Sequence, residues 1–308
     1  MASFRPLLPK DFVASREALE RCWTLAESLD YTRWLATSHY ENFHVVSLLL
    51  PKRLHQDFYN VYSFCRWADD LADEISDSQD SLRLLSWWRG MLDQLYEGQS
   101  SHPVFIALSG TIQKHGIPKQ PFSDLLLAFV QDQTTIRYAT WEELFDYCRY
   151  SANPVGRLVL YLCGYRDGER QRLSDATCTA LQLANFWQDV SVDLQKNRVY
   201  IPLEVMARHG YTEAELFAGE ENAAFEEVMR DVVSRAHQLF QQGLPLNRSV
   251  GSRLAVDLEL FSRGGIRVLE KIEQQGYRVL HRRPVIGKLE RLGLLLGSLA
   301  RVALRPFA

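Results

Sequence analysis

Apolar residues recur at intervals of three and four along most of the chain, which is the spacing of one face of an α-helix. This periodicity predicts helices over residues 19–29, 82–96, 103–115, 121–136, 141–161, 225–239 and 252–274. No stretch shows the alternation of apolar and polar residues that predicts a half-buried strand, and no fixed-period repeat is present. The pattern therefore predicts an all-α chain.

Four polar residues interrupt the apolar pattern of residues 62–74: Tyr62, Arg66, Asp69 and Asp73. Their spacing places them on one face of a helix. Two carboxylates one turn apart repel each other by about 0.2–0.5 kcal/mol, and a bound cation such as Mg²⁺, which prefers oxygen ligands, removes that cost. Taken alone, such a cluster is more typical of a solvated acidic helix face.

A second cluster of the same design changes this interpretation. Gln182, Asn185, Asp189 and Asp193 again share helical spacing, and the segment 197–202 that follows is predicted to end the helix. Two such helices could face each other across a cavity and hold metal ions between them, as happens in helix bundles. The pairing of the clusters favours a metal site over two unrelated polar patches.

The residues around these acids resemble the two aspartate-rich motifs of the squalene/phytoene synthase family. The motifs here are Arg66-x-x-Asp69-Asp70-x-x-Asp73 and Asn185-x-x-x-Asp189-x-x-x-Asp193. Segments 38–43, 47–51 and 151–156 most resemble one bacterial branch, the HpnC-type hydroxysqualene synthases of hopanoid biosynthesis. The resemblance implies one isoprenoid synthase domain over residues 1–308, built as a helical bundle with a central cavity.

The resemblance also implies a set of site residues. The implied Mg²⁺ ligands, for about two or three ions, are Asp69, Asp73, Asn185 and Asp189. The implied catalytic residues are Asp69, Asp73, Asp189, Asp193, Tyr150 and Asn153. Those implied for substrate binding are His39, Tyr40, Glu41, Asn42, Phe43, Tyr62, Arg66, Gln182, Gln188 and Tyr277. Asp70 points off the common face and is left out.

The function implied by the resemblance is loss of diphosphate from presqualene diphosphate, followed by capture of the carbocation by water to give hydroxysqualene. The sequence departs from the condensing relatives in three places. Glu41 and Gln188 stand where those relatives tend to carry Lys and Arg, and Ser151-Ala152-Asn153-Pro154 replaces a small-residue Val-Ala-Gly pattern. Two fewer cations suit a site for one diphosphate. Head-to-head condensation of two prenyl diphosphates such as farnesyl diphosphate, giving presqualene diphosphate, squalene or phytoene, stays open. A non-enzymatic helical scaffold for membrane-associated pathway enzymes also stays open.

Aromatic side chains can shield a carbocation, because the face of the ring attracts positive charge. Phe43, Tyr147, Tyr150, Phe186 and Trp187 are candidates, although aromatics at helical spacing more often belong to the core. Pro154 interrupts the predicted helix 141–161 and frees a backbone carbonyl. The hypothesis is that this carbonyl and Asn153 hold the quenching water. A plain proline bend, or a loop between two helices, is the alternative.

Composition narrows the function classes. The chain has 308 residues, is 46% hydrophobic and carries a net charge of −3, without the basic excess of nucleic-acid-binding proteins. Its five cysteines form no Cys-x-x-Cys pair, which argues against a disulfide framework. No signal peptide or bilayer-spanning stretch is evident, so a cytoplasmic location is expected. No Gly-x-Gly-x-x-Gly element is present, and no NADPH is expected.

The C-terminal segment 276–308 differs from the rest of the chain in charge. It holds seven Lys or Arg residues and a single acid, Glu290, together with six apolar positions between Leu292 and Val302. This pattern is typical of a basic amphipathic helix lying on an anionic membrane, at the inner face of the cell membrane. An ordinary surface helix is the alternative. A partnership with other hopanoid pathway enzymes is a further expectation.

Overall fold

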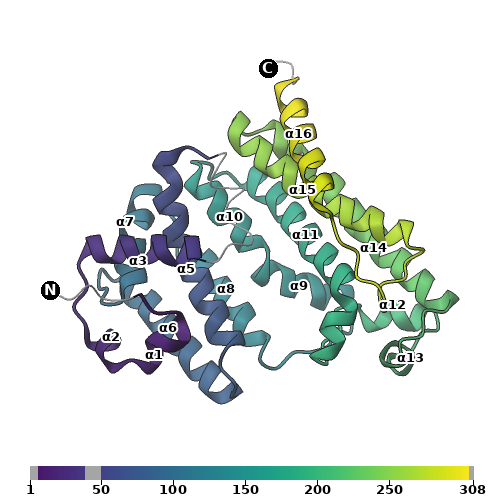
Figure 1. The fold of residues 1–308 in the computed structure, drawn as a ribbon, viewed down its shortest axis with the longest axis horizontal. Helices are drawn as coiled ribbons and strands as arrows, with labels where there is room; N and C mark the ends of the chain where they lie inside the picture. Colours follow the sequence, from purple (N-terminus) through teal and green to yellow (C-terminus); the bar gives the residue numbers. More distant parts are fainter. Residues whose placement is uncertain (1–5, 39–49, 305–308) are drawn as a thin grey trace. The chain divides into compact units, whose positions relative to one another are not determined.

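The structure is a computed structural model that describes residues 6–38 and 50–304. Within these residues the regular secondary structure is helical, apart from one isolated bridge between Arg137 and Val199 (Figure 1). The all-α prediction is confirmed. No helix of the described residues is long and apolar enough to cross a membrane, and all five cysteines are free thiols.

The chain divides into two compact units, and the first comprises Met1–Thr134 and Arg157–Arg166. Its helices are α1 (Pro9–Ala14), α2 (Arg16–Glu20), α3 (Leu25–Ser38), α5 (Lys52–Asp73), α6 (Ser78–Tyr96), α7 (Pro103–His115) and α8 (Gln120–Gln131). Within this unit α5 packs on α3, α6, α7 and α8. Helix α5 therefore forms its centre.

The second unit comprises Thr135–Gly156 and Asp167–Ala308, so the division falls within α10 (Asn153–Leu162). Its other helices are α9 (Trp141–Ser151), α11 (Gly168–Gln195), α12 (Leu203–Arg208), α13 (Glu213–Ala218), α14 (Ala223–Gly243), the 3₁₀-helix η1 (Leu244–Arg248), α15 (Ser252–Gln274) and α16 (Lys288–Ala303). Helix α11 packs on α14, α15 and α9. The prediction of one domain over the whole chain stays a prediction.

Two predicted helices, 103–115 and 252–274, have the bounds that the sequence pattern gives them. In α7 the signals are local, because Pro103 stands at the first helical position and Gly116 follows the last one with φ of +60°. Helix α6 begins at Ser78, earlier than predicted. There the Asp77 side chain accepts hydrogen bonds from the backbone N–H groups of Gln79 and Asp80.

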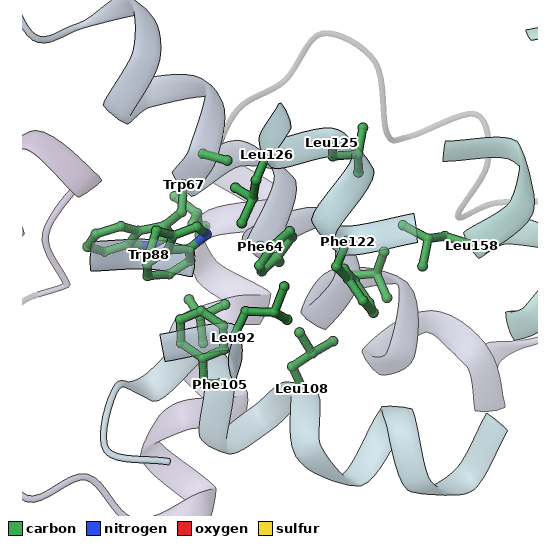
Figure 2. Close-up of a cluster of buried hydrophobic side chains, with 14 of the residues drawn as sticks. Phe64, Trp67, Trp88, Leu92, Phe105, Leu108, Phe122, Leu125, Leu126 and Leu158 are labelled. Atoms are coloured by element: carbon green, nitrogen blue, oxygen red, sulfur yellow. The ribbon is translucent and has the colours of Figure 1, made fainter. Parts of the chain in front are cut away.

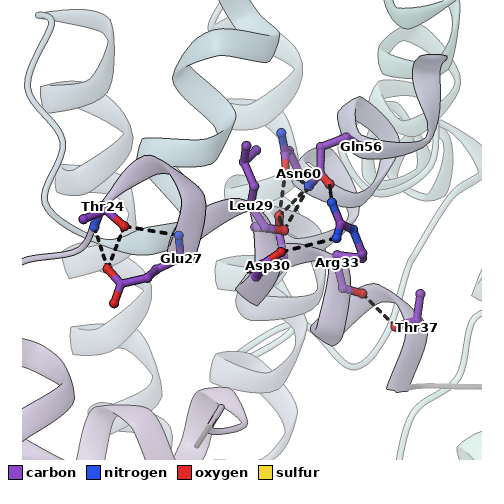
Figure 3. Close-up of polar contacts among 9 residues, drawn as sticks. Thr24, Glu27, Leu29, Asp30, Arg33, Thr37, Gln56 and Asn60 are labelled. Carbon is purple, nitrogen blue, oxygen red and sulfur yellow. Dashed lines mark hydrogen bonds and ion pairs between the residues drawn. The ribbon is translucent and has the colours of Figure 1, made fainter. Parts of the chain in front are cut away.

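The predicted helix 19–29 is wrong, since α2 ends at Glu20 and α3 begins at Leu25. Thr24 explains the break. Its hydroxyl accepts a hydrogen bond from the Glu27 N–H, and the Glu27 carboxylate accepts from the Thr24 N–H at 2.9 Å (Figure 3). These reciprocal bonds form a capping box, which starts a new helix inside the apolar repeat.

The predicted helix 141–161 is interrupted at Ala152 and becomes α9 and α10. Pro154 stands at the start of α10, where its missing N–H costs no helical hydrogen bond. Gly156 lies so close to α11 that a Cβ atom would overlap the Ser174 hydroxyl, as expected of a glycine at a helix contact. Gly164 does not share this role, because it has open space around it and φ of +87° in the turn after α10.

Two further predictions need correction at helix ends. Helix α8 stops at Gln131 instead of residue 136, because the backbone turns there through hydrogen bonds from Gln133 to Val130 and from Thr134 to Gln131. The Gln133 side chain then donates to the Ala72 carbonyl at 3.1 Å. In the basic C-terminal segment, only Lys288–Ala303 is helical among the described residues.

Aromatic rings form the centre of the core of the first unit. Trp67 of α5 and Trp88 of α6 stack with ring centroids 4.8 Å apart and planes 8° from parallel. Phe64 lies beside them and meets the edge of Phe122 from α8 (Figure 2). All four rings are fully buried. Burying an aromatic ring contributes several kcal/mol at ~25 cal/mol per Å², so these contacts fix α5 in its unit.

A buried polar network sets the position of α5 along its neighbours. The Asn60 carbonyl oxygen accepts a hydrogen bond from Thr32 of α3 at 2.7 Å, and its amide donates to the Ala107 carbonyl of α7 at 3.1 Å. Gln56, one turn earlier, donates to the Asn60 carbonyl oxygen, and both side chains appear in Figure 3. A satisfied buried network favours one arrangement of three helices over its sliding alternatives.

Asp257 of α15 has a buried carboxylate that no hydrogen bond stabilises among the described residues. Only 2% of the residue is exposed, and both carboxylate oxygens are buried with no hydrogen-bond partner among the described residues. Burial raises the pKa of Asp257 to about 7. The carboxyl is therefore held in its neutral form in the folded chain at mildly acidic pH.

This carboxyl should make stability depend on pH. An unfolded aspartate ionises near pH 3.8 and the native one near pH 7, so the native state binds more protons between these values and stability falls as the pH rises. At about 1.4 kcal/mol per pKa unit, the free energy of unfolding should drop by about 2 kcal/mol between pH 5.5 and 8. We expect Asp257→Asn to remove this drop in denaturant titrations.

The matched control is Asp146→Asn, which removes an exposed carboxylate of α9. That variant should keep the pH dependence of the wild type. If the free energy of unfolding depended on pH equally in the wild type and in Asp257→Asn, ionisation of Asp257 would not be its cause.

Candidate active site

The first acidic cluster lies in the last three turns of α5. The Arg66 guanidinium stands 2.6 Å from the Asp70 carboxylate and 3.7 Å from that of Asp69. Asp70 is buried, whereas half of the Asp69 side chain is exposed and Asp73 is exposed as well. Asp70 thus orients Arg66, which agrees with leaving it out of the ligand set.

The charges of this cluster are not fully balanced. Burial, and after it the Asp73 carboxylate one turn away, raises the pKa of Asp69 to about 6, although Arg66 opposes the shift. The Arg66 Nε–H is buried without a hydrogen-bond partner among the described residues. An anion bound between Arg66 and a cation on the two carboxylates would satisfy both groups.

The second acidic cluster lies in the last turns of α11, which ends at Gln195 as the sequence predicts. Asn197 follows with φ of +55° and turns the chain. Burial, and then the Asp189 carboxylate, raises the pKa of Asp193 to about 6. Gln182 is half-buried and Asn185 is exposed, so both amides are reachable from solvent.

The structure adds Arg283, which sequence reasoning missed. Its guanidinium forms a two-pronged ion pair with the Asp189 carboxylate, with Nε on one oxygen and a terminal nitrogen 3.2 Å from the other. Next to it, the Gln188 amide donates to the Pro284 carbonyl at 2.5 Å. The only signal in the sequence is the basic composition of the segment 276–308, which does not say which acid a given arginine meets.

The donor set of both clusters fits Mg²⁺. The described residues contain no group of three His, Cys, Asp or Glu side chains placed to hold a metal ion unaided. Mg²⁺, however, is usually bound through one or two carboxylates and completes its shell with water and substrate phosphate oxygens. Each cluster offers two carboxylates of that kind, Asp69 with Asp73 and Asp189 with Asp193, and Asn185 adds an amide oxygen.

Two of the predicted aromatic residues of the second unit, Tyr147 and Phe186, form a stack with Tyr200. Phe186 lies 3.8 Å from Tyr200, nearly parallel to it, and Tyr147 lies within 6.2 Å of both rings. Trp187 is fully buried against Trp141. Tyr200 is a further residue that sequence reasoning used only to end the helix. Trp187 is core, and the Tyr147, Phe186 and Tyr200 stack supports the end of α11.

Tyr150 and Asn153 stand on either side of the break between α9 and α10. The Tyr150 hydroxyl accepts a hydrogen bond from Arg149 at 3.1 Å, and the ring lies against the same guanidinium. The Asn153 side chain is buried, and its oxygen accepts a hydrogen bond from the Thr179 hydroxyl of α11 at 2.9 Å. The break is thus held to α11 through Asn153.

Tyr277 occupies an uncommon backbone conformation for a residue with a side chain, with φ of +60° after Gly276. The Arg230 guanidinium lies 4.8 Å from the centre of its ring. Tyr277 begins the segment that reaches Arg283 and Pro284. Its role in substrate binding stays a prediction. The predicted residues His39, Tyr40, Glu41, Asn42 and Phe43 lie outside the described residues.

Comparison with known proteins identifies the family. The Squalene/phytoene synthase family model matches residues 36–290, which include both acidic clusters. The chain belongs to the squalene/phytoene synthase family. Family membership makes it an enzyme of the prenyltransferase type, from a family that performs head-to-head prenyl condensation and is typically Mg²⁺-dependent.

Individual members of the squalene/phytoene synthase family resemble this chain in sequence and in structure. The crystal structure of squalene synthase HpnC from Alicyclobacillus acidocaldarius is 43% identical, with a TM-score of 0.80 over 82% of this chain and 96% of that one. A phytoene synthase from Thermus thermophilus is 30% identical over 84% of this chain and 88% of its own length. A dehydrosqualene synthase at 24% identity has a TM-score of 0.81. The isoprenoid synthase fold is confirmed.

Proposed function

We propose that this enzyme converts presqualene diphosphate to hydroxysqualene, with release of diphosphate and addition of water to the carbocation. The observation that carries the proposal is Gln188, beside Asp189, a proposed Mg²⁺ ligand. It stands where condensing relatives tend to carry an arginine, and its amide is engaged by the Pro284 carbonyl. Position 188 therefore supplies no cation, and the positive charge that this half of the site offers to a diphosphate is the Arg283 guanidinium on Asp189. The 43% identity to an HpnC protein supports the same branch.

The proposed chemistry begins at the diphosphate. Arg66 offers a planar fork of donors, and Tyr62 and Gln182 add neutral hydrogen bonds to the phosphate oxygens. Mg²⁺ ions bound by Asp69 and Asp73 of α5, and by Asn185 and Asp189 of α11, would neutralise the charge that develops on the leaving diphosphate, and Asp193 would add a carboxylate to the second set. The carbon–oxygen bond breaks with its electron pair on the diphosphate, and water adds to the cation and loses a proton.

Head-to-head condensation of two prenyl diphosphates is the second candidate. It is favoured by the curated relatives, since those from Thermus thermophilus and maize are phytoene synthases at 30% and 27% identity. The two reactions share the ionisation of a diphosphate and differ in the substrate that starts it.

Product analysis separates the two candidates. We expect purified enzyme with Mg²⁺ to form hydroxysqualene from presqualene diphosphate, and to form no thirty-carbon product from farnesyl diphosphate alone. Chelation of Mg²⁺ should stop turnover. Asp69→Asn and Asp189→Asn should each lower the rate by about 10²-fold or more, because each weakens the binding of the Mg²⁺ whose charge stabilises the leaving diphosphate.

Asp30→Asn, at an exposed acid of α3, is the matched control and should keep the wild-type rate. Presqualene diphosphate or a forty-carbon hydrocarbon formed from prenyl diphosphates, with no alcohol from presqualene diphosphate, would support condensation instead.

Asn153 is proposed to position the water that quenches the cation. We expect Asn153→Leu to shift the products from alcohol towards hydrocarbon, because the apolar side chain removes the polar contact for water while filling the same space. Gas chromatography of the products measures the ratio. Thr179→Val removes the hydroxyl that donates to Asn153 and should cause a smaller shift in the same direction. An unchanged ratio in Asn153→Leu would remove Asn153 from the mechanism.

Arg283 is proposed to exchange its carboxylate partner for the diphosphate. Its ion pair with Asp189 competes with Mg²⁺, and once Mg²⁺ takes the carboxylate the guanidinium becomes available to phosphate oxygens. We expect Arg283→Gln to bind Mg²⁺ alone about two- to fivefold more tightly, and Mg²⁺ with inorganic diphosphate about tenfold more weakly. Isothermal titration calorimetry measures both affinities.

Arg282→Gln is the matched control, because it changes the neighbouring exposed arginine. It should leave the affinity for Mg²⁺ unchanged. If Arg283→Gln weakened the binding of Mg²⁺ alone, the ion pair would be organising the metal site and not competing for it.

A further inference from the structure

Helix α16 carries a continuous apolar stripe that faces away from its own unit. Leu289, Leu292, Leu296 and Leu299 follow one another at intervals of three and four and are 85%, 53%, 58% and 39% exposed. Helical geometry puts all four on one face. Four exposed leucines in a row are far more than the scattered apolar residues of an ordinary surface.

The opposite face of α16 is fixed to α15. The Glu290 carboxylate lies 2.9 Å from both Arg267 and Lys271, and Arg301 lies 2.9 Å from Glu259. Ser298, between these ion pairs along the helix, is fully buried. Two ion-paired ends and a buried centre hold the helix in one orientation. The leucine stripe is therefore presented outward by the structure.

The charge around the stripe is positive. Lys288 and Arg291 are exposed and each precedes a leucine of the stripe, so they flank it on one side. Glu290, the only acid of the segment 276–308, is engaged by Arg267 and Lys271. The exposed face of α16 thus combines leucines with two cations, and the helix offers these cations no carboxylate of its own.

We propose that α16 rests on a membrane surface rich in anionic phospholipids, with the leucine stripe at the boundary between headgroups and acyl chains. Lys288 and Arg291 would lie level with the lipid phosphates. A second copy of α16 fits this face less well, because it would cover the cations with the same leucines and bring no free carboxylate to pair with them. The proposal does not depend on which diphosphate the enzyme uses.

Vesicle sedimentation tests the proposal with the full chain. We expect the wild type to sediment with vesicles of phosphatidylglycerol and phosphatidylcholine and to stay mostly in solution with phosphatidylcholine alone. The triple variant Leu289→Gln/Leu292→Gln/Leu296→Gln should bind the anionic vesicles at least about tenfold more weakly than the wild type. Lys288→Gln/Arg291→Gln should lose about tenfold on anionic vesicles.

The matched control is Leu8→Gln/Leu25→Gln/Leu127→Gln, which removes three leucines that are also exposed, but on other helices or beside them. It should bind vesicles as the wild type does. The proposal is overturned if the wild type binds neither kind of vesicle, if the α16 triple variant binds as the wild type does, or if that variant changes only the oligomeric state in light scattering.

Discussion

Repulsion between partly buried carboxylates is the constraint on which the candidate site depends. Asp69 and Asp73 on α5, and Asp189 and Asp193 on α11, are pairs one turn apart on their helices. In each pair burial and the neighbouring charge together raise the pKa of one member to about 6. A chain selected for stability alone would replace these acids. A cation bound at each pair would remove this cost, and the family of this chain is typically Mg²⁺-dependent.

The rest of each unit holds these acids in place. In the first unit the Trp67 and Trp88 stack and the Asn60 network fix α5 against its neighbours. In the second, α11 is held to the α9–α10 break through Asn153 and Thr179, and its end is supported by the stack of Phe186 on Tyr200. Buried contacts thus position the helices that carry the acids, so a change in the core can alter the site without touching it.

Much of the fold and part of the site could be predicted from the sequence, because the signals are local. The bounds of α7 follow from Pro103 and Gly116, and the spacing of the acids places each cluster on one helix face. Thr24 shows where periodicity fails, since its capping box breaks an apolar repeat that continues through it. Arg283 shows the other limit. It meets an acid 94 residues away, and no local pattern encodes such a contact.

Both acidic clusters lie near the C-terminal end of their helix. Helices α5 and α11 end at Asp73 and Gln195, with no basic residue in the last turn of either. The carbonyl end of a helix bears about half a negative charge, so the acids stand where the helix macrodipole opposes them. A divalent ion there would neutralise both sources of negative potential at once, and would be bound by the native chain alone. Metal binding would therefore strengthen folding, and the enzyme would be most heat-resistant when it is loaded for catalysis.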